Sequence, residues 1–431
     1  MIRFIKKLIP TPIFRTCQPT YHFLLAYIGA IFYGFPARKM FVIGVTGTKG
    51  KSSTVELINT ILEEAGYKTA LAGTIRFKVG AESRPNLYKM SMPGRFFIQK
   101  FLSDAHKVGC THVVLEITSE AARQFRSRGI DLDMLVFTNL SPEHIESHGS
   151  FEKYRDAKRS IGRTLADSGF GGSAKKEKWI IANRDDAESA FYLSLPVTHT
   201  IPFSLANAEP YTLTQNSRVK SSVAKNSIEF TFKGEKMSAP LTGLFNLYNA
   251  LGAVVCADAL GISLATIKKA LTNIATIKGR VERVNAGQDF DVIVDYAHTA
   301  DSLEKFYLAF PDQRKICVLG NTGGGRDTWK RKEMGTIADK YCDEIILTDE
   351  DPYDDDPRSI VEQMTEGIKN KPYKIIMDRR EAIRTAVVGA KTGYVVLITG
   401  KGTDPYIMVA DGKKIPWSDV IVAREELEKI K

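Results

Sequence analysis

The sequence contains few cysteines, and their spacing does not suggest that they work together. Five cysteines, Cys17, Cys110, Cys256, Cys317 and Cys342, are scattered over 431 residues, and no two of them form a Cys-x-x-Cys pair. An odd number of widely spaced cysteines argues against a disulfide framework and against a zinc ribbon. We therefore expect the protein to work in a reducing cytoplasm.

The sequence also lacks an apolar run of the length that crosses a bilayer. The apolar stretch Phe23–Phe35 falls short of the roughly 20 residues that a membrane-spanning helix requires. No small-residue cleavage site of a secretory signal follows this stretch. Basic residues flank it, namely Arg3, Lys6, Lys7, Arg15, Arg38 and Lys39. Two interpretations of residues 1–38 stay open: a hydrophobic helix packed on the first domain, or an interfacial helix resting on the inner face of an anionic membrane.

Long basic runs with interleaved aromatic residues, internal repeats and low-complexity tracts are absent as well. Sixty Lys and Arg residues against 50 Asp and Glu residues give a formal charge of +10. This charge favours anionic partners such as nucleotides, phosphates or a membrane surface, although most of the basic side chains simply solvate the surface. Nucleic-acid binding is disfavoured. The length predicts two or three domains.

The most informative stretch that is present is Phe41–Ser53, an apolar run that leads into a glycine-rich turn ending in Gly-Lys-Ser. It predicts a strand, a phosphate-binding loop and the start of a helix. Glycines permit a tight turn and close approach to a phosphate, Lys51 supplies a mobile positive charge, and the Ser52 hydroxyl can bind Mg²⁺. Val45 stands where the general pattern has its first glycine. The predicted ligand is a nucleoside triphosphate.

Predicted strands and helices alternate through most of the chain. Buried-strand patterns occur at Thr111–Ile117, Met134–Phe137, Trp179–Ile181, Asp291–Val294, Ile316–Leu319, Ile345–Leu347 and Val395–Ile398, and helical patterns at residues 51–65 and Asn246–Leu260. Alternation of polar and apolar residues between Pro196 and Pro240 predicts a small antiparallel patch. The fold class is therefore α/β, with a P-loop-type, mainly parallel central sheet followed by a Rossmann-like domain. We expect an N-terminal segment 1–38, a central domain 39–277 and a C-terminal domain 278–431.

Further motifs follow the loop in a fixed order, and together they resemble the Mur ligase family of ATP-dependent amide-bond-forming enzymes. They are Glu116, Thr138–His144, Lys158, Gly243–Asn249, Gly279–Glu282 and Asp295–Thr299. Within that family the chain is most similar to the UDP-N-acetylmuramoyl-tripeptide synthetases, through Ser147–Gly149, Tyr154–Lys158, Gly323–Asp327, Lys330, Arg331, Thr348–Pro352 and Gly400–Gly402. The resemblance implies an ADP-forming peptide ligase of peptidoglycan precursor synthesis, with ATP and Mg²⁺ as cofactors.

The resemblance also implies a role for individual residues. An acceptor carboxylate would be activated as an acyl phosphate and then attacked by the amine of an amino acid. The nucleotide would be bound by Gly47, Thr48, Gly50, Lys51, Ser52, Ser53, Asn246, Asn249, Arg280, Asp295 and His298. Metal ligands would be Ser52, Glu116, His144 and Lys158, the last after carbamylation, and the catalytic groups would be Lys51, Lys158, His144 and Arg280. Arg331, Asp351, Tyr353, Gly400 and Asp404 would contact the amino acid.

Several of these residues also have a plainer interpretation. Glu116 is equally an ordinary carboxylate at a strand end, a lone histidine such as His144 is more often structural, and Lys158 is otherwise a surface lysine. Asn246 would otherwise cap a helix, and Asp295 would otherwise stabilise a turn.

Departures from the family pattern leave the substrates open. The uridine-nucleotide-binding domain expected before residue 39 is missing. Either a UDP-linked acceptor is held by the two remaining domains, or the acceptor is lipid-linked. Thr118-Ser119-Glu120 replaces a Ser-Ser-His segment near the acceptor site. Glu350-Asp351-Pro352-Tyr353 replaces an Asp-Asn-Pro-Arg segment, so the bidentate carboxylate clamp of an arginine is lost. Thr403-Asp404 replaces His-Glu. The acidic residues favour a cationic amine such as lysine over diaminopimelate.

Two other functions are also compatible with the sequence. One is another Mur-like ligase, of the folylpolyglutamate or peptide-polymer type. The other is a nucleotide-binding, membrane-surface scaffold without catalytic activity.

Overall fold

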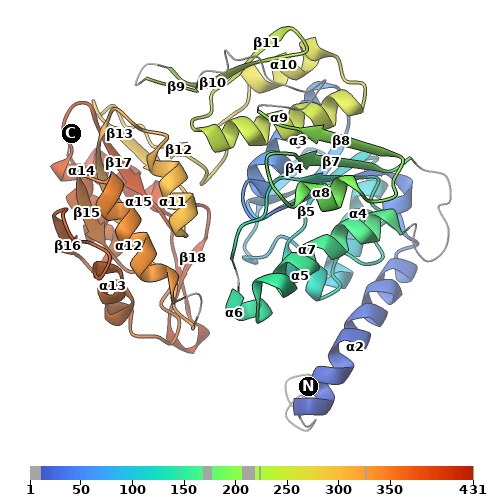
Figure 1. Cartoon of the computed structure of the whole chain (residues 1–431), viewed down its shortest axis with the longest axis horizontal. Coiled ribbons are helices and arrows are strands. Elements are labelled where there is room, and N and C mark those ends of the chain that lie inside the picture. Colours follow the sequence, from blue (N-terminus) through green and yellow to red (C-terminus); the bar gives the residue numbers. More distant parts are fainter. Residues whose placement is uncertain are drawn as a thin grey trace. The chain divides into compact units, whose positions relative to one another are not determined.

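The computed structural model describes residues 11–143, 145–167, 177–205, 219–222, 225–325 and 328–430. Two compact units make up the chain, and each is described here by itself (Figure 1). The N-terminal unit falls within residues 1–141, 151–212 and 249–267, and the C-terminal unit within residues 142–150, 213–248 and 268–431. Both units are mixed α/β structures, as the alternating pattern predicts.

An eight-stranded sheet with the order β4-β3-β2-β5-β1-β6-β7-β8 forms the centre of the N-terminal unit. Its strands are β1 (Phe41–Thr46), β2 (Thr69–Ala72), β3 (Arg76–Val79), β4 (Glu82–Pro85), β5 (His112–Glu116), β6 (Met134–Phe137), β7 (Trp179–Asn183) and β8 (His199–Phe203). Six neighbouring strands, from β2 to β8 in this order, pair in parallel, whereas β3 pairs antiparallel with both β2 and β4. Continuous burial along β5 and β6 agrees with a parallel sheet covered on both faces.

The helices of this unit connect the strands and cover the sheet. They are α2 (Thr11–Phe32), the 3-10 helix η1 (Pro36–Lys39), α3 (Lys51–Glu64), α4 (Arg95–Lys107), α5 (Ser119–Arg123), α7 (Phe151–Ala166) and α8 (Ser189–Leu193), with α9 (Leu244–Ala259) and α10 (Leu264–Thr272) extending into the C-terminal unit's range. The predicted helix after the loop is confirmed as α3, and the predicted alanine-rich helix as α9. Among the described helices, none combines the length and the hydropathy needed to cross a membrane.

The C-terminal unit contains a six-stranded sheet with the order β12-β13-β17-β14-β15-β16. Its strands are β12 (Glu282–Arg283), β13 (Asp291–Val294), β14 (Arg314–Leu319), β15 (Glu344–Leu347), β16 (Tyr373–Ile375) and β17 (Tyr394–Ile398). All of them except β12 run parallel, and the four predicted strands of this domain are confirmed.

Alternate residues of these strands supply two separate apolar cores. Cys317 and Leu319 belong to one core, whereas Ile316 and Val318 belong to the other. The helices α11 (Ala300–Tyr307), α12 (Lys330–Tyr341) and α13 (Pro357–Thr365) contribute to the first core, and α14 (Arg379–Gly389) and α15 (Asp419–Glu428) to the second. The sheet is therefore covered by helices on both faces, which is the doubly wound arrangement.

The antiparallel patch predicted between Pro196 and Pro240 is confirmed only in part and as a separate sheet, because β8, within the same range, is a parallel strand of the eight-stranded sheet. The separate sheet consists of β9 (Val219–Ser222), β10 (Lys225–Phe232) and β11 (Glu235–Ala239) in the order β11-β10-β9. Lys233 and Gly234, which join β10 to β11, both have a positive φ, as a tight two-residue hairpin requires. The strands β18 (Tyr406–Met408) and β19 (Lys414–Pro416) form a second hairpin, and the short helix α6 (Ile145–His148) completes the unit.

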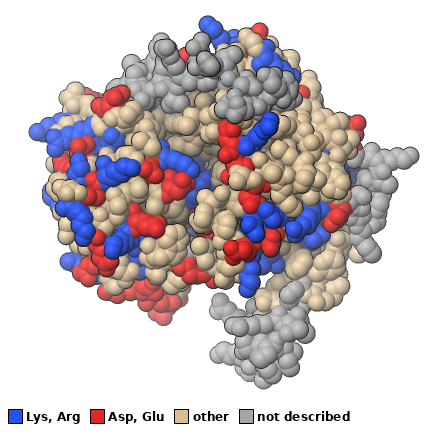
Figure 2. Space-filling model, in the orientation of Figure 1, with Lys and Arg blue, Asp and Glu red and all other residues tan. Residues whose placement is uncertain are grey.

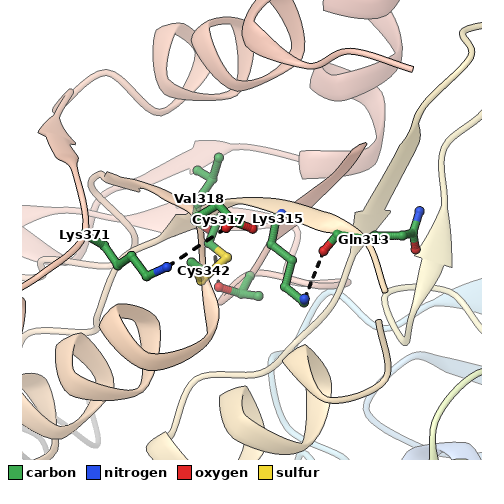
Figure 3. The surroundings of a disulfide bond; sticks show 8 residues. Gln313, Lys315, Cys317, Val318, Cys342 and Lys371 are labelled. Carbon is green, nitrogen blue, oxygen red and sulfur yellow. Dashed lines mark hydrogen bonds and ion pairs between the residues drawn. A yellow bond between two sulfur atoms is a disulfide. The ribbon is translucent and has the colours of Figure 1, made fainter. Parts of the chain in front are cut away.

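A disulfide bond joins Cys317 to Cys342, contrary to the expectation from the cysteine spacing (Figure 3). Cys317 lies in β14, and Cys342 lies just before the adjacent strand β15. The chain leaves β14, passes through α12 and returns beside it, so two cysteines 25 residues apart become neighbours with a Cα–Cα distance of 6.1 Å. Both cysteines are completely buried. A crossover connection of this kind leaves no short Cys-x-x-Cys signature in the sequence.

Candidate functional site

The predicted phosphate loop follows β1 directly and ends where α3 begins at Lys51. Gly47 and Gly50 have φ values of +147° and +81°, which L side chains rarely adopt. A Cβ atom on Gly47 would lie 1.9 Å from the Thr138 hydroxyl, and one on Gly50 would lie 2.2 Å from the side-chain oxygen of Asn249. The backbone and its neighbours therefore both require glycine at these two positions.

Two residues after β6 hold the loop in place. The Thr138 hydroxyl and the Asn139 side-chain amide both donate to the backbone oxygen of Lys49, over 2.7 and 3.1 Å. In return, the Lys49 amide donates to the Asn139 side-chain oxygen, and the Thr48 amide donates to the Asn139 carbonyl. The Thr-Asn pair thus fixes the loop backbone, a role that the sequence motif alone did not reveal.

Ser52 and Glu116 form the centre of the loop site. The Ser52 hydroxyl donates to Oε2 of Glu116 over 3.0 Å, and both residues are buried. Thr74 orients the same carboxylate, because its amide donates to Oε2 over 2.7 Å and its hydroxyl donates to Oε1 over 2.9 Å. The carboxylate is therefore held at the end of β5 by three hydrogen bonds and lies next to the first turn of α3.

Two lysines place their ammonium groups on the loop backbone. Lys51 Nζ donates to the Thr48 carbonyl over 2.8 Å, and Lys158 Nζ donates to the Gly47 carbonyl over 2.5 Å. Lys158 comes from α7 and is only 2% exposed, so the surface-lysine interpretation is wrong. Its ammonium also lies 5.0 Å from the ring centroid of Tyr154, whose hydroxyl is 2.9 Å from the Thr48 hydroxyl.

The remaining loop-site residues lie close by or in α9. Ser53 is buried in the first turn of α3. Asn249 lies against Gly50, with its side-chain oxygen 3.5 Å from the Thr54 hydroxyl. Asn246 is buried in the first turn of α9 and donates through its side-chain amide to the Thr242 carbonyl, which is not the contact of a helix N-cap, because a capping side chain accepts from a backbone amide. His144 lies outside the described residues.

These groups fit a nucleoside triphosphate and a Mg²⁺ ion. The described residues contain no group of three or more His, Cys, Asp or Glu side chains that would enclose a metal ion. Mg²⁺ does not need such a cage, because it usually keeps several waters and binds one or two protein oxygens together with phosphate oxygens. The adjacent Ser52 hydroxyl and Glu116 carboxylate are a donor pair of that kind.

The other predicted residues lie in the C-terminal unit, around the carboxyl ends of its strands. Asp295 follows β13, and its carboxylate accepts hydrogen bonds from the amides of Val281 and Ala297, so it does stabilise the turn. Arg280 lies over the Tyr296 ring, 4.6 Å from its centroid, and donates to its neighbouring Gly279 carbonyl.

His298 has an oxygen acceptor beside each ring nitrogen. Its Nδ1 is 2.7 Å from the Tyr296 carbonyl, and its Nε2 is 3.1 Å from Oε1 of Glu143. Glu143 is buried and belongs to the same unit, although the sequence motif that contains it gave it no role of its own.

Asp351 and Asp404 surround a fully buried lysine. Lys401 Nζ lies 2.7 Å from Oδ1 of Asp351 and 3.7 Å from Oδ2 of Asp404. The same Asp351 oxygen accepts a hydrogen bond from the Met408 amide. Asp351 therefore balances an internal cation, and its negative charge is not simply that of a solvated loop.

Glu350 is the most unusual acidic residue of this cluster. It is 3% exposed, and burial raises the pKa of its carboxyl group. Its Oε1 accepts from the Thr322 hydroxyl over 3.1 Å, whereas its Oε2 has no hydrogen-bond partner among the described residues. A Cβ on Gly400, whose φ is +104°, would lie 2.2 Å from that oxygen. The backbone of Gly400 therefore packs directly against Glu350.

Tyr353 and Arg331 complete the predicted amino-acid site. Tyr353 has a φ of +53°, which is rare for an aromatic residue, and its amide donates to the Met408 carbonyl. The Arg331 guanidinium donates to Gln363 over 2.9 Å and lies 3.7 Å from Asp355. Burial lowers the pKa of Arg331, and Asp355 opposes this effect.

The charge of Asp404 and, to a smaller extent, burial raise the pKa of the Tyr296 phenol well above its usual value.

The structure thus gathers the sequence-predicted residues into two groups, one around the loop and one around the strand ends of the C-terminal unit. Three residues with clear roles in these groups have no individual role in the sequence motifs: Thr74, Asn139 and Lys401. Glu350, in contrast, is one of the acidic residues from which the sequence predicts a cationic amine. Of the three residues, Lys401 has a sequence context that could have identified it, because it is a charged residue between two glycines shortly after the buried strand β17.

Comparisons with known proteins agree with this geometry. Residues 45–257 match the model of the Mur ligase middle domain, and residues 279–402 match that of the Mur ligase, glutamate ligase domain. A UDP-N-acetylmuramoyl-L-alanyl-D-glutamate--2,6-diaminopimelate ligase of Geobacillus thermodenitrificans is 36% identical over 420 residues, which cover 94% of this chain and 82% of that protein. The ligase of the same name from Caldanaerobacter subterraneus subsp. tengcongensis is 36% identical over 408 residues, covering 94% of this chain and 81% of the relative.

Solved structures give the same result for the fold. A UDP-N-acetylmuramoyl-L-alanyl-D-glutamate--2,6-diaminopimelate ligase matches with a TM-score of 0.61 and 27% identity over 91% of this chain and 79% of that one. Escherichia coli FolC, solved with DHPP and ADP, matches with a TM-score of 0.65 and 20% identity over 88% of this chain and 90% of that one, which shows a shared fold. From the two domain matches and the extended identity to these relatives, the chain belongs to the Mur ligase family of ATP-dependent amide-bond-forming enzymes.

Proposed function

We propose that the chain is an ADP-forming ligase that joins the carboxylate of a peptidoglycan-precursor-like acceptor to the amine of an amino acid. The observation that carries this proposal is the Ser52–Glu116 pair at the end of a glycine loop on which Lys51 and Lys158 place their ammonium groups. Such a site has the charges that phosphoryl transfer to a carboxylate needs. The reaction would take place in the cytoplasm. In the sequence, the boundary between the central and C-terminal domains would fall near Lys278-Gly279.

The residues of the loop bind and position the reactants. The loop amides and Lys51 hold the β- and γ-phosphates, while Ser52 and Glu116 hold Mg²⁺, which would neutralise charge on the transferring phosphoryl group. Arg280 supplies a further cation to that group. His144 and a carbamylated Lys158 are proposed as ligands of a second metal ion, and Asn246, Asn249, Asp295 and His298 as contacts of the nucleotide.

Lys158 has the surroundings that carbamylation favours. Its amine is 2% exposed and lies on the loop, where a second cation beside Lys51 is unfavourable. The ammonium first loses one proton; the neutral amine then forms a bond between its nitrogen and the carbon of CO₂ and loses a second proton, so that an anionic carbamate replaces the cation. The product would be able to bind a metal ion.

The amino acid would bind in the C-terminal unit, near Arg331, Tyr353, Gly400, Asp404 and Glu350. Asp351 already faces Lys401, so we assign it a positioning role. The unpartnered oxygen of Glu350 suits the ammonium group of a cationic amino acid such as lysine. The acceptor is either UDP-linked or lipid-linked.

A ligation screen tests the proposal. UDP-linked and lipid-linked acceptors are crossed with the common amino acids and diaminopimelate, and ADP release and product mass are measured. We expect release that requires both an acceptor and an amine. In the Glu116→Gln variant the rate should fall about 100-fold or more, because the variant loses a metal ligand while keeping its shape. Glu188→Gln, which removes a partner of Arg159 in the same unit, should keep the wild-type rate.

The screen also separates the alternatives. Activity with a folate acceptor and glutamate would indicate the folylpolyglutamate type. ATP binding without ADP release across the whole panel would indicate a non-catalytic nucleotide-binding scaffold and would contradict the proposal.

A further inference from the structure

Helix α2 exposes several large apolar side chains, whereas its most deeply buried residues are small. The residues that face the protein are small: Ala26 and Ala30 are completely buried, and Gly29 packs against Phe96 and Gln99 of α4. A Cβ on Gly129 would lie 3.0 Å from Ala30, so the two backbones approach closely on this side. Small residues of α2 therefore make the closest contacts on this side, and the larger Phe23 adds an edge contact with the ring of Phe125, with 5.9 Å between the ring centroids.

The large apolar residues of α2 lie on the opposite side. We call this set the outer stripe: Tyr21, Leu24, Ile28, Ile31 and Phe32, which are 56%, 53%, 51%, 58% and 72% exposed. Their spacing of three, four, three and one residues keeps them within about one third of the helix circumference. The Phe32 ring lies near the ring of Phe96, with 6.3 Å between their centroids, but each of the five residues is more than half exposed. An uncovered apolar face of this size on a soluble protein marks an interaction surface.

The charge of the surrounding sequence identifies the kind of partner. The first acidic residue of the chain is Glu56, whereas six basic residues precede Met40, and residues 16–37 carry no formal charge. Figure 2 shows basic and acidic side chains interspersed over the visible face of the molecule, while the described part of α2 is tan at the lower right. Lys39 is exposed just beyond the helix. Although Arg38 lies 3.9 Å from Asp131, a segment whose own formal charges are all positive complements an anionic lipid surface.

Two arginines beside the helix add to this positive potential. The backbone of Arg95, at the start of α4, lies against Gly29, and Arg126 lies close enough to act on it electrostatically. Burial and the charge of Arg126 lower the pKa of Arg95. An anionic headgroup near this pair would relieve that repulsion.

We infer that the outer stripe of α2 lies in the interface of an anionic membrane and holds the enzyme there as a peripheral protein. The five most exposed apolar residues of the described part of α2 lie on one side of the helix, which matches interfacial binding, and no described helix has the length and hydropathy to cross the bilayer. This inference goes beyond the proposed ligase reaction and does not depend on it, because lipid binding needs neither nucleotide nor acceptor.

Vesicle cosedimentation of the full chain, without ATP or acceptor, tests the inference. Vesicles of phosphatidylcholine with about 30% phosphatidylglycerol are compared with pure phosphatidylcholine, each at low and high salt. We expect binding to the anionic vesicles that weakens as salt is added. The triple variant Leu24→Ser/Ile28→Ser/Ile31→Ser should bind about tenfold more weakly or worse, since each change removes apolar area from the interface.

A matched control uses three helical-region residues of the C-terminal unit with similar exposure. Leu308, Val388 and Ile421 are 53%, 59% and 58% exposed, and their replacement by Ser should leave vesicle binding unchanged. Circular dichroism and thermal unfolding confirm that both triple variants are folded. Any comparison is made only at equal folded concentration.

Three results would overturn the inference. One is a folded wild-type protein that does not sediment with anionic vesicles, and another is binding that is the same with and without phosphatidylglycerol. The third is a wild-type dimer in light scattering that becomes a monomer in the outer-stripe variant without any vesicle binding, which would show that a second copy covers this face.

Discussion

The loop site of the N-terminal unit and the strand-end site of the C-terminal unit hold their charged groups in opposite ways. At the loop, the two lysines donate to backbone carbonyls, and Glu116 accepts from hydroxyl and amide groups. At the strand ends, buried charges pair with each other, as Lys401 does with Asp351 and Arg379 with Asp419.

The difference follows from what each site has to bind. A lysine that donates to a backbone carbonyl can exchange that contact for a phosphate oxygen and gain a charge-assisted hydrogen bond. The paired charges of the C-terminal unit are costly to separate, so they fix the positions of neighbouring groups. Within the C-terminal unit, Glu350 departs from this pattern because one of its carboxylate oxygens has no hydrogen-bond partner.

The largest expected effect is on the loop side of this comparison. Replacing Lys158 with Ala should lower the ligation rate about 100-fold or more, because a buried group in contact with the phosphate loop is removed. The control is Lys153→Ala on the exposed side of the same helix, which should keep the wild-type rate. Steady-state ADP release measures both. An unchanged rate in Lys158→Ala, or wild-type preparations that never respond to bicarbonate after dialysis at low pH, would remove the carbamylated-ligand role.

The next effect concerns the stability of the C-terminal unit. The double variant Cys317→Ala/Cys342→Ala should lose about 3 kcal/mol of unfolding free energy, since the bond closes a loop of 25 residues in the unfolded chain. Urea unfolding followed by circular dichroism measures the change. Cys110→Ala, at a buried free cysteine of the N-terminal unit, serves as the control and should not shift the C-terminal transition. Identical unfolding of the wild type with and without a reductant would contradict the disulfide.

The smallest effect tests the unpartnered acid at the strand ends. The folded-state pKa of Glu350 is raised, so its contribution to stability is present at low pH and is lost as the pH rises through that pKa. The stability of Glu350→Gln relative to wild type should therefore increase between pH 4 and pH 8: the difference in unfolding free energy, variant minus wild type, rises by about 1 kcal/mol or less. Glu362→Gln, at an exposed position, should show no such trend.

An activity measurement completes that test. If Glu350 receives the ammonium group of the amino acid, Glu350→Gln should raise the KM for the amino acid while leaving the KM for ATP unchanged. A more stable variant with unchanged kinetics would restrict Glu350 to a structural role.

Local sequence determined the parts of this protein that depend on neighbouring residues. The strand–loop–helix segment at Phe41–Ser53 and most of the parallel strands follow from hydrophobic periodicity, whereas the parallel strands β2, β8 and β16 were not predicted. Glycine at positions 47 and 50 is required by the local backbone conformation and also by the neighbouring Thr138 and Asn249. The motif order was sufficient to recognise the family, because the same short segments recur in the same sequence.

Tertiary structure alone decided which distant residues meet. Lys158 reaches the carbonyl of Gly47 across 111 positions of sequence, Cys342 returns to Cys317 through a crossover, and Glu350 is left with an unpartnered oxygen by the close packing of Gly400. The apolar composition of α2 did not decide which face of the helix packs on the unit, since both of its faces are apolar. Steric fit settled it, because only the face with Ala26, Gly29 and Ala30 allows close approach to α4 and Gly129, and the larger residues are consequently left outside.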